Sequence, residues 1–155
     1  MPKVLFVCTG NLCRSPMAEV LLRHRLAQEG LDSWQVASAG TWAQNGQPAS
    51  GYAIQVMAER GLDLRVHRSR PVDRPMMEEA DLVLVMTRHH AEALRSEFPD
   101  LGNKVWLLSQ MGGNRLYDVN DPYGGSLMEY QYCAAELESL IESGLARMRT
   151  WVEGA

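Results

Sequence analysis

The stretch Val4-Leu-Phe-Val-Cys8-Thr-Gly-Asn-Leu-Cys13-Arg14-Ser15-Pro16 carries the strongest structural signals in this sequence. Its apolar beginning is typical of a buried strand, which stops where Thr9-Gly10-Asn11 supplies residues that favour turns. Ser15 followed by Pro16 is typical of a helix N-cap and the first helical position. The stretch therefore predicts a strand, a tight loop and a helix. Cys8 would lie at the carboxyl end of the strand, where open α/β sheets bind ligands.

The loop between this strand and helix is suited to an anion. Gly10 and Asn11 can adopt left-handed backbone angles, which would turn successive N–H groups inward ahead of a helix N-terminus. These dipoles would favour the thiolate of Cys8, which is the nucleophilic form of a thiol. The guanidinium of Arg14 can hold two oxygens of a phosphate. The predicted phosphate-binding residues are Thr9, Gly10, Asn11, Leu12, Cys13, Arg14 and Ser15.

A nucleophilic sulfur, a ring of N–H donors and an arginine together predict attack on phosphorus. Two plainer interpretations are a redox or metal-binding pair formed by Cys8 and Cys13, or a Cys8 that only fills the core. Both leave the glycine, the asparagine and the arginine of the loop unexplained.

Composition limits the class of protein. With 155 residues, of which 46% are hydrophobic and 22% charged, the chain 1–155 is expected to be one domain with its own core. No apolar run is long enough to span a bilayer, and a strand stands where a signal peptide would begin, so we expect a cytoplasmic protein without membrane contact. Three cysteines do not suggest a disulfide scaffold or paired zinc ligands, and a net charge of −4 argues against nucleic acid as a partner.

Strands and helices alternate along the chain. Strands are expected at Lys3–Val7, Trp34–Ser38, Asp81–Met86 and Lys104–Leu108. Helices are expected at Pro16–Gln28, around Ala53–Met57 with an end at Gly61, from Thr87 to about Phe98, and after Ser126, with Tyr130, Cys133, Ala134, Leu137, Ile141 and Met148 on one face. Ser109–Gly125 contains four glycines and a proline, and is expected to be a long functional loop. This alternation predicts a parallel sheet with helices on both faces.

The string Cys8-Thr-Gly-Asn-Leu-Cys-Arg14-Ser15-Pro16, close to the N-terminus, resembles the low-molecular-weight protein tyrosine phosphatase family. Asp121-Pro122 in the long loop strengthens the resemblance. The family implies a single three-layer α/β domain with a four-stranded parallel sheet in the order 2-1-3-4 and a phosphate-binding loop after the first strand. It also implies that Asp121 is the catalytic acid, and the following proline keeps this aspartate in extended backbone. Asp118 is the less favoured alternative acid.

The expected reaction has two steps. Cys8 attacks phosphorus while Arg14 and the loop N–H groups hold the oxygens, and Asp121 protonates the leaving oxygen. Water then hydrolyses the cysteinyl-phosphate with Asp121 as base. We expect no metal and no cofactor. The partners would be a phosphotyrosine-containing protein or an aryl phosphate, with inorganic phosphate or another oxyanion as product or inhibitor.

The resemblance implies that a polar network of Ser15, Ser38 and His67 holds Asn11 in its strained conformation. The remaining roles are expected from the residues and their spacing. Ser15 would also donate to the Cys8 thiolate while capping the helix, and Cys13 would form a reversible disulfide with Cys8, or simply pack beneath the loop. Leu12, Trp42 and Tyr123 are the expected walls of the substrate pocket, because apolar and aromatic side chains suit the ring of phosphotyrosine.

Three alternatives remain open. Related enzymes of the family are protein-arginine phosphatases, which typically have threonine where this chain has Leu12, although Asp121-Pro-Tyr-Gly-Gly-Ser126 and Ser38-Ala-Gly-Thr41 are similar to theirs. An arsenate reductase on the same fold needs further cysteines near residues 80–90, where this chain has none. A non-catalytic phosphate-binding module would need neither the thiol nor a placed aspartate.

Overall fold

The computed structural model describes residues 1–113 and 115–154. It contains a four-stranded parallel sheet in the order β2-β1-β3-β4, which confirms the order that the resemblance implied. The strands are β1 (Lys3–Cys8), β2 (Gln35–Gly40), β3 (Leu82–Val85) and β4 (Val105–Leu107). The helices are α1 (Arg14–Gln28), α2 (Gly51–Glu59), α3 (Arg74–Glu79), α4 (Arg88–Glu97), α5 (Leu108–Gly113) and α6 (Leu127–Glu153), with the 3-10 helix η1 (Pro99–Lys104) before β4.

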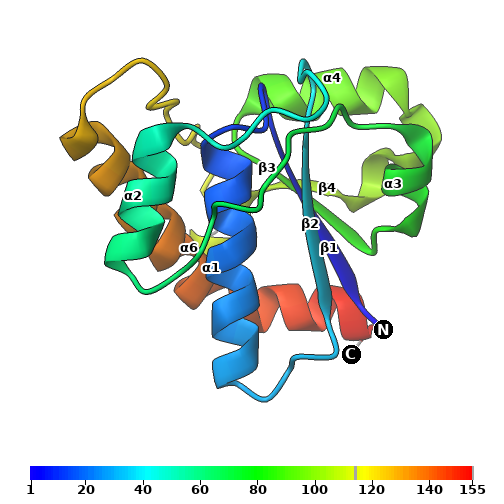
Figure 1. Ribbon diagram of the computed structural model, residues 1–155. Coiled ribbons are helices and arrows are strands. Elements are labelled where there is room, and N and C mark those ends of the chain that lie inside the picture. The colour runs from blue at the N-terminus through cyan, green and yellow to red at the C-terminus, as the bar shows by residue number, and fades with distance from the viewer. Residues whose placement is uncertain (114, 155) are drawn as a thin grey trace.

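Helices cover both faces of the sheet, with α1, α2 and α6 on one side and α3 and α4 on the other (Figure 1). Successive side chains of β1 point to opposite faces, so the strand divides the core in two. Val4 and Phe6 pack with residues of α1 and α6, whereas Leu5 and Val7 pack with residues of α3 and α4. Cys8 continues the row of Val4 and Phe6, which places its sulfur on the α1 side at the carboxyl end of the strand.

Two helix starts agree with the sequence. The Thr87 hydroxyl accepts from His90 N, and the His90 side chain accepts from Thr87 N, so the two form a reciprocal cap on α4. Ser126 Oγ accepts from Glu129 N at 3.2 Å and caps α6. All six residues of the predicted face of α6 are buried. These end signals are local hydrogen bonds, which is why the sequence can indicate them.

The start of α1 differs from the prediction. The helix begins at Arg14, with Cys13 in the N-cap position, and Ser15 makes no capping hydrogen bond. Ser15 is fully buried, and its hydroxyl lies 2.9 Å from Cys8 Sγ. The expected capping role of Ser15 is therefore wrong, because the hydroxyl is engaged inside the loop.

Two short helices were not predicted from the sequence. The Asp73 side chain accepts from Met76 N at 2.9 Å and starts α3, which is only six residues long. α5 occupies the first part of the predicted loop Ser109–Gly125, in which residue 114 lies outside the described residues. Six residues are too few for a helical repeat of apolar positions to be recognised.

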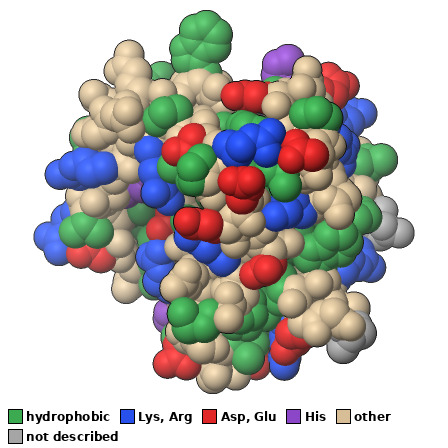
Figure 2. Space-filling view, turned by 90° about the vertical axis from the view of Figure 1, so that its right-hand side faces the viewer, with side chains coloured by type: hydrophobic (Ala, Val, Ile, Leu, Met, Phe, Trp, Pro, Cys, Tyr) green, Lys and Arg blue, Asp and Glu red, His purple; other side chains and the backbone are tan. Residues whose placement is uncertain are grey.

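Acidic and basic side chains are interspersed on the face formed by α3 and α4 (Figure 2). Arg74 on this face lies 3.0 Å from Asp100, and Lys3 lies 3.1 Å from Glu79. Among the residues described, no helix combines the length and the apolar character that a membrane crossing needs.

α5 and α6 approach each other backbone to backbone at two glycines. A Cβ built on Gly144 would lie 2.9 Å from the carbonyl carbon of Met111 and 3.1 Å from Gly112 N. A Cβ on Gly112 would lie 2.9 Å from the Cα of Leu140. Because these neighbours are backbone atoms, they cannot move aside as a flexible side chain would.

We expect Gly144→Ala to destabilise the protein. Overpacking at such a contact costs about 1–3 kcal/mol, and alanine returns up to about 1 kcal/mol of helix propensity. The free energy of unfolding, measured by chemical denaturation, should therefore fall by roughly 1–2 kcal/mol. Gly51→Ala in α2, where a Cβ meets nothing within 4 Å, is the control and should be neutral or slightly stabilising. Equal stabilities for the two variants would contradict this account of the α5–α6 contact.

Candidate active site

The loop that joins β1 to α1, here called the Cys8 loop (residues 8–14), has one strained residue. Asn11 has a φ of 58°, the only positive φ of a non-glycine residue in the ranges 1–113 and 115–154. Gly10 does not share this left-handed conformation, contrary to the expectation from sequence. Asparagine tolerates the left-handed region better than most residues, so one residue makes the turn.

A polar network holds Asn11 in this conformation. Asn11 Nδ2 donates to Ser15 Oγ at 2.9 Å and to Ser38 Oγ at 3.0 Å. His67 Nε2 donates to the Asn11 carbonyl oxygen at 2.7 Å. The structure thus brings together the four residues of the expected network. Arg70 N, which donates to Asn11 Oδ1 at 3.0 Å, completes it and was not anticipated.

The amide of Asn11 sets the direction of the hydrogen bonds that end at Cys8. An amide nitrogen only donates, so Ser15 Oγ accepts from Asn11 and keeps its own proton for another acceptor. Cys8 Sγ lies 2.9 Å from Ser15 Oγ, whereas the carbonyl oxygen of Ala39 is farther away at 3.4 Å. In the same way Ser38 accepts from Asn11 and donates to Glu19 Oε1 at 2.6 Å. Ser15 therefore directs a donor at the sulfur.

The carbonyl groups of the Cys8 loop are bound from outside. Thr41 N donates to the carbonyl oxygen of Cys8, and Trp42 N donates to that of Thr9, at 2.9 Å each. His67 Nε2 donates to the carbonyl oxygen of Asn11. Ser50 N donates to the carbonyl oxygen of Leu12 at 3.0 Å. In a planar trans peptide the following N–H points opposite to the carbonyl. The N–H groups of residues 9, 10, 12 and 13 are therefore turned to the inner side of the loop, which makes an anion-binding nest.

A glycine of β2 allows the loop to lie against the sheet edge. A Cβ on Gly40 would lie 3.0 Å from Asn11 N, 2.9 Å from the Cβ of Ala43, and still closer to the carbonyl oxygen of Thr9. Only a residue without a side chain leaves room for the loop backbone here. No local pattern in the sequence marks Gly40 for this role.

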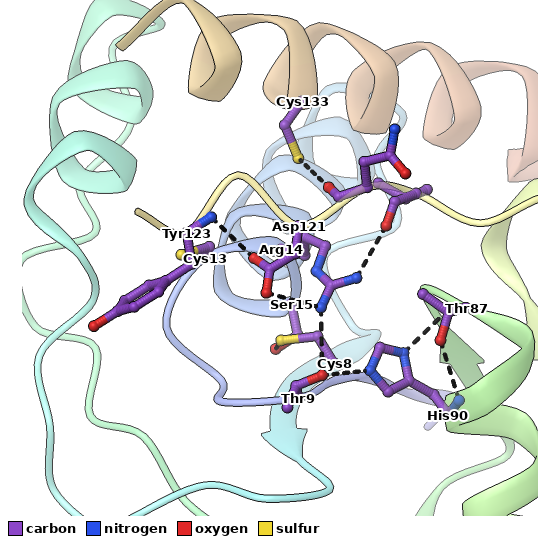
Figure 3. A network of polar contacts seen from close by, with 12 residues as sticks. Cys8, Thr9, Cys13, Arg14, Ser15, Thr87, His90, Asp121, Tyr123 and Cys133 are labelled. Carbon is purple, nitrogen blue, oxygen red and sulfur yellow. Dashed lines mark hydrogen bonds and ion pairs between the residues drawn. The ribbon is translucent and has the colours of Figure 1, made fainter. Parts of the chain in front are cut away.

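The Cys8 loop encloses a pocket with a volume of about 160 Å³. Its lining consists of Cys8, Thr9, Gly10, Leu12, Cys13, Arg14, Asp121 and Tyr123. Figure 3 shows Cys8, Arg14 and Asp121 converging on this space from β1, α1 and the loop before α6. Cys8 and Arg14 are buried, with 2% and 4% of their surfaces exposed, while the side chain of Asp121 is 47% exposed.

Arg14 is fixed on several sides. Its Nη1 donates to the carbonyl oxygen of Val119 at 2.9 Å, and its Nη2 lies 3.4 Å from Thr9 Oγ1 and 3.5 Å from Asp121 Oδ2. Its Nε is buried and has no acceptor among the described residues. A buried guanidinium with a donor to spare is unusual, because an unsatisfied donor costs about 1–3 kcal/mol.

The loop that carries Asp121 is anchored just before this residue. Val119 N donates to the carbonyl oxygen of Met86 at 2.9 Å, and Asp121 Oδ1 accepts from Tyr123 N at 3.0 Å. Asp118 Oδ1 accepts from Arg88 N at 2.9 Å, which holds the pKa of Asp118 below its ordinary value. Asp118 does not line the pocket, so the structure places Asp121 at the pocket and the alternative acid at the start of α4.

His90 belongs to the site, although nothing in the sequence distinguished it from His89. Its Nε2 lies 2.8 Å from Thr9 Oγ1, and its Nδ1 accepts from Thr87 N at 3.1 Å. Burial, and to a lesser extent the nearby charge of Arg14, lowers the pKa of His90 to about 4. The ring is therefore neutral at neutral pH.

Two of the three expected pocket walls line the pocket. Leu12 and Tyr123 do, but Trp42 is 84% exposed and is not part of the lining. The backbone of Trp42 is held at the outer side of the Cys8 loop by its bond to the carbonyl oxygen of Thr9, which leaves the indole in solvent. The expected wall at Trp42 is therefore wrong.

All three cysteines are free thiols in this structure. Cys13 Sγ lies 3.2 Å from Ser50 Oγ and 3.3 Å from Tyr130 Oη, and burial raises the pKa of this thiol. Burial likewise raises the pKa of Cys133 to about 12. Within the described part of the chain, no group of three or more His, Cys, Asp and Glu side chains is arranged to hold a metal ion.

Comparisons with known proteins agree on one family. A family model described as low molecular weight phosphotyrosine protein phosphatase matches residues 3–152. The chain is 41% identical over 138 residues to a protein-arginine-phosphatase of Bacillus subtilis (strain 168), an alignment that covers 89% of this chain and 91% of that protein.

Solved structures give the same result. A low molecular weight protein tyrosine phosphatase from T. tengcongensis is 39% identical, with a TM-score of 0.90 over 95% of this chain and 99% of that chain. Vibrio vulnificus Wzb in complex with benzylphosphonate is 31% identical, with a TM-score of 0.85 over 94% of this chain and 98% of that chain. This chain therefore belongs to the low molecular weight phosphotyrosine protein phosphatase family.

Proposed function

We propose that this protein hydrolyses phosphotyrosine in proteins, and small aryl phosphates, through a cysteinyl-phosphate formed on Cys8. The observation that carries the proposal is the convergence of Cys8 Sγ, the inward N–H groups of its loop and Arg14 on one pocket, with Asp121 beside it. The cytoplasm is a suitable compartment, because its reducing conditions keep a nucleophilic thiol free.

Binding of the phosphate group uses donors that face the pocket. The inward N–H groups and Arg14 hold the three non-bridging oxygens of the phosphate, and an oxygen placed beside Arg14 gives its buried Nε an acceptor. These donors are fixed before the substrate arrives, so they stabilise charge in the transition state without reorganisation. The relative from Vibrio vulnificus was solved with a phosphonate carrying a benzyl group, which supports an aryl-linked oxyanion as ligand.

In the first step the Cys8 thiolate attacks phosphorus, so that the S–P bond forms while the bond from phosphorus to the tyrosyl oxygen breaks. Ser15 stabilises the thiolate beforehand through its hydrogen bond of 2.9 Å. Asp121 gives its proton to the leaving oxygen. Asp121 Oδ2 lies 3.5 Å from Arg14 Nη2. A phosphate held by Arg14 replaces Asp121 as the partner of this guanidinium, which frees the carboxyl group to face the leaving oxygen.

In the second step water attacks the phosphorus of the cysteinyl-phosphate. The Asp121 carboxylate accepts a proton from this water, the S–P bond breaks, and the Cys8 thiolate is restored. Inorganic phosphate leaves and, at high concentration, competes with substrate for the same donors. Apart from the substrate and this water, the scheme uses only side chains and backbone groups of the chain.

The pocket walls support tyrosine as the substrate side chain. Leu12 and Tyr123 offer apolar and aromatic surface to a phenyl ring. Protein-arginine phosphatase activity is the second candidate, because a relative at 41% identity carries that name. A hydroxyl at position 12 could orient a guanidinium or a water, and the leucine of this chain offers none.

Parallel assays of a phosphotyrosine peptide and a phosphoarginine peptide separate the two candidates. We expect a higher kcat/KM on phosphotyrosine for the natural chain, and a shift towards phosphoarginine for Leu12→Thr. If the natural chain prefers phosphoarginine, the second candidate replaces the first. Absence of turnover on both peptides and on aryl phosphates would reject phosphatase activity altogether.

Asp121→Asn is expected to separate substrates by their leaving groups. General acid catalysis contributes about 10²–10⁴-fold, and phenyl phosphate needs it far more than p-nitrophenyl phosphate does. The value to measure is kcat/KM, which reports the steps up to loss of the leaving group. Asp118→Asn, at a residue bound to the start of α4, is the matched control and should stay close to the natural chain. Equal losses on the two esters would remove Asp121 from the role of acid.

A further inference from the structure

We infer that His90 is a positioning residue that acts through Thr9. It holds the Thr9 hydroxyl so that the proton of this hydroxyl is directed at the oxyanion in the pocket. This inference rests on the proposed function, because it assigns one more donor to the phosphate site.

The hydrogen bonds around His90 fix which ring nitrogen carries the proton. Thr87 N donates to Nδ1 at 3.1 Å, so this nitrogen has a lone pair and no proton. The proton of the neutral ring is therefore on Nε2, which lies 2.8 Å from Thr9 Oγ1. His90 Nε2 donates, and the hydroxyl oxygen of Thr9 accepts.

A second donor points at the same oxygen. Arg14 Nη2 lies 3.4 Å from Thr9 Oγ1, and a guanidinium has no acceptor to offer. With both neighbours donating, the Thr9 hydroxyl is left with its own proton, for which the described residues provide no acceptor. Thr9 lines the pocket, and Figure 3 shows its hydroxyl between the His90 ring and Arg14, next to Cys8. An oxyanion bound by Arg14 is thus the acceptor within reach.

The surroundings explain why a histidine suits this place. His90 is 2% exposed, and both of its ring nitrogens are engaged. Arg14, His89, Asp118 and Asp121 are the charged and titratable groups that act on it, with burial as the larger influence. A neutral ring can donate to Thr9 without placing a second cation beside Arg14.

The position of His90 also joins two parts of the site. It lies in the first turn of α4, where Arg88 N binds Asp118 of the loop that carries Asp121. One helix start therefore contacts the Cys8 loop through His90 and the acid loop through Arg88.

Thr9 variants test whether the hydroxyl binds the oxyanion. Thr9→Val keeps the shape and removes the hydroxyl, and should lower kcat/KM on p-nitrophenyl phosphate by about 10- to 100-fold, the range for a hydrogen bond to a charged group. The inhibition constants of inorganic phosphate and vanadate should rise with it. Thr9→Ser restores the hydroxyl and should stay within about threefold of the natural chain. Unchanged inhibition constants in Thr9→Val would overturn the inference.

A double-mutant cycle tests whether His90 acts through Thr9. His90→Leu should lower kcat/KM by about 2- to 12-fold in the natural chain, in keeping with a hydrogen bond net of water. In the Thr9→Val background it should have almost no further effect. His90→Gln, which keeps a donor towards Thr9, should recover most of the loss. Equal losses in both backgrounds would make His90 a merely structural residue and overturn its role.

One further readout keeps effects on stability and on function apart. Thermal unfolding of each variant shows whether it is folded at the assay temperature. If His90→Leu does not fold, the same cycle is run with His90→Asn, whose amide oxygen can take the place of Nδ1 towards Thr87 N but which lacks the donor at Nε2. A natural chain that is inactive on every phosphate ester would reject the proposed function, whereas an active chain with an unaffected Thr9→Val variant would reject this inference alone.

Discussion

The site depends on the orientation of a few peptide groups between β1 and α1. The carbonyls of Cys8, Thr9, Asn11 and Leu12 are all bound on the outer side of the loop. Their N–H partners must then face inward. This arrangement requires Asn11 in the left-handed region, which costs about 1–3 kcal/mol for a residue other than glycine. The hydrogen bonds to Ser15, Ser38, Arg70 and His67 offset that cost.

The rest of the structure places partners around this loop. β1 carries Cys8 to the sheet edge, and β2 ends in Gly40, which lets the loop approach. Arg14 ties the loop to the carbonyl of Val119, two residues before Asp121, and Val119 N is bound to the carbonyl of Met86 just after β3. Arg14 therefore ties the loop that carries the nucleophile to the loop that carries the acid.

The sequence predicts the structure correctly where the signal is local. The strands lie within two residues of their predicted bounds, and the Cys8 loop, Arg14 and Asp121 meet at one pocket as expected. The predictions are wrong or incomplete where contacts between residues distant in the sequence determine the structure. Ser15 has the sequence context of a helix cap, but its hydroxyl is buried and hydrogen-bonded to Cys8 Sγ. Trp42 stands in the right segment but faces solvent, and the direction of a side chain on a loop is not encoded in its neighbours. His90 contacts Thr9, which lies 81 positions away in the sequence, and Gly40 lies against the same residue, 31 positions away. No local pattern indicates such contacts.

The central claim is that the phosphoryl group passes through Cys8. The most direct measurement mixes the Asp121→Ala variant rapidly with p-nitrophenyl phosphate, quenches with acid, and identifies the modified residue by mass spectrometry with fragmentation. Since this variant lacks the base of the second step, the account predicts a phosphoryl group on Cys8, not on Cys13, formed together with a burst of nitrophenol. Release of nitrophenol and inorganic phosphate at equal rates, with no phosphorylated Cys8 at any time, would contradict it.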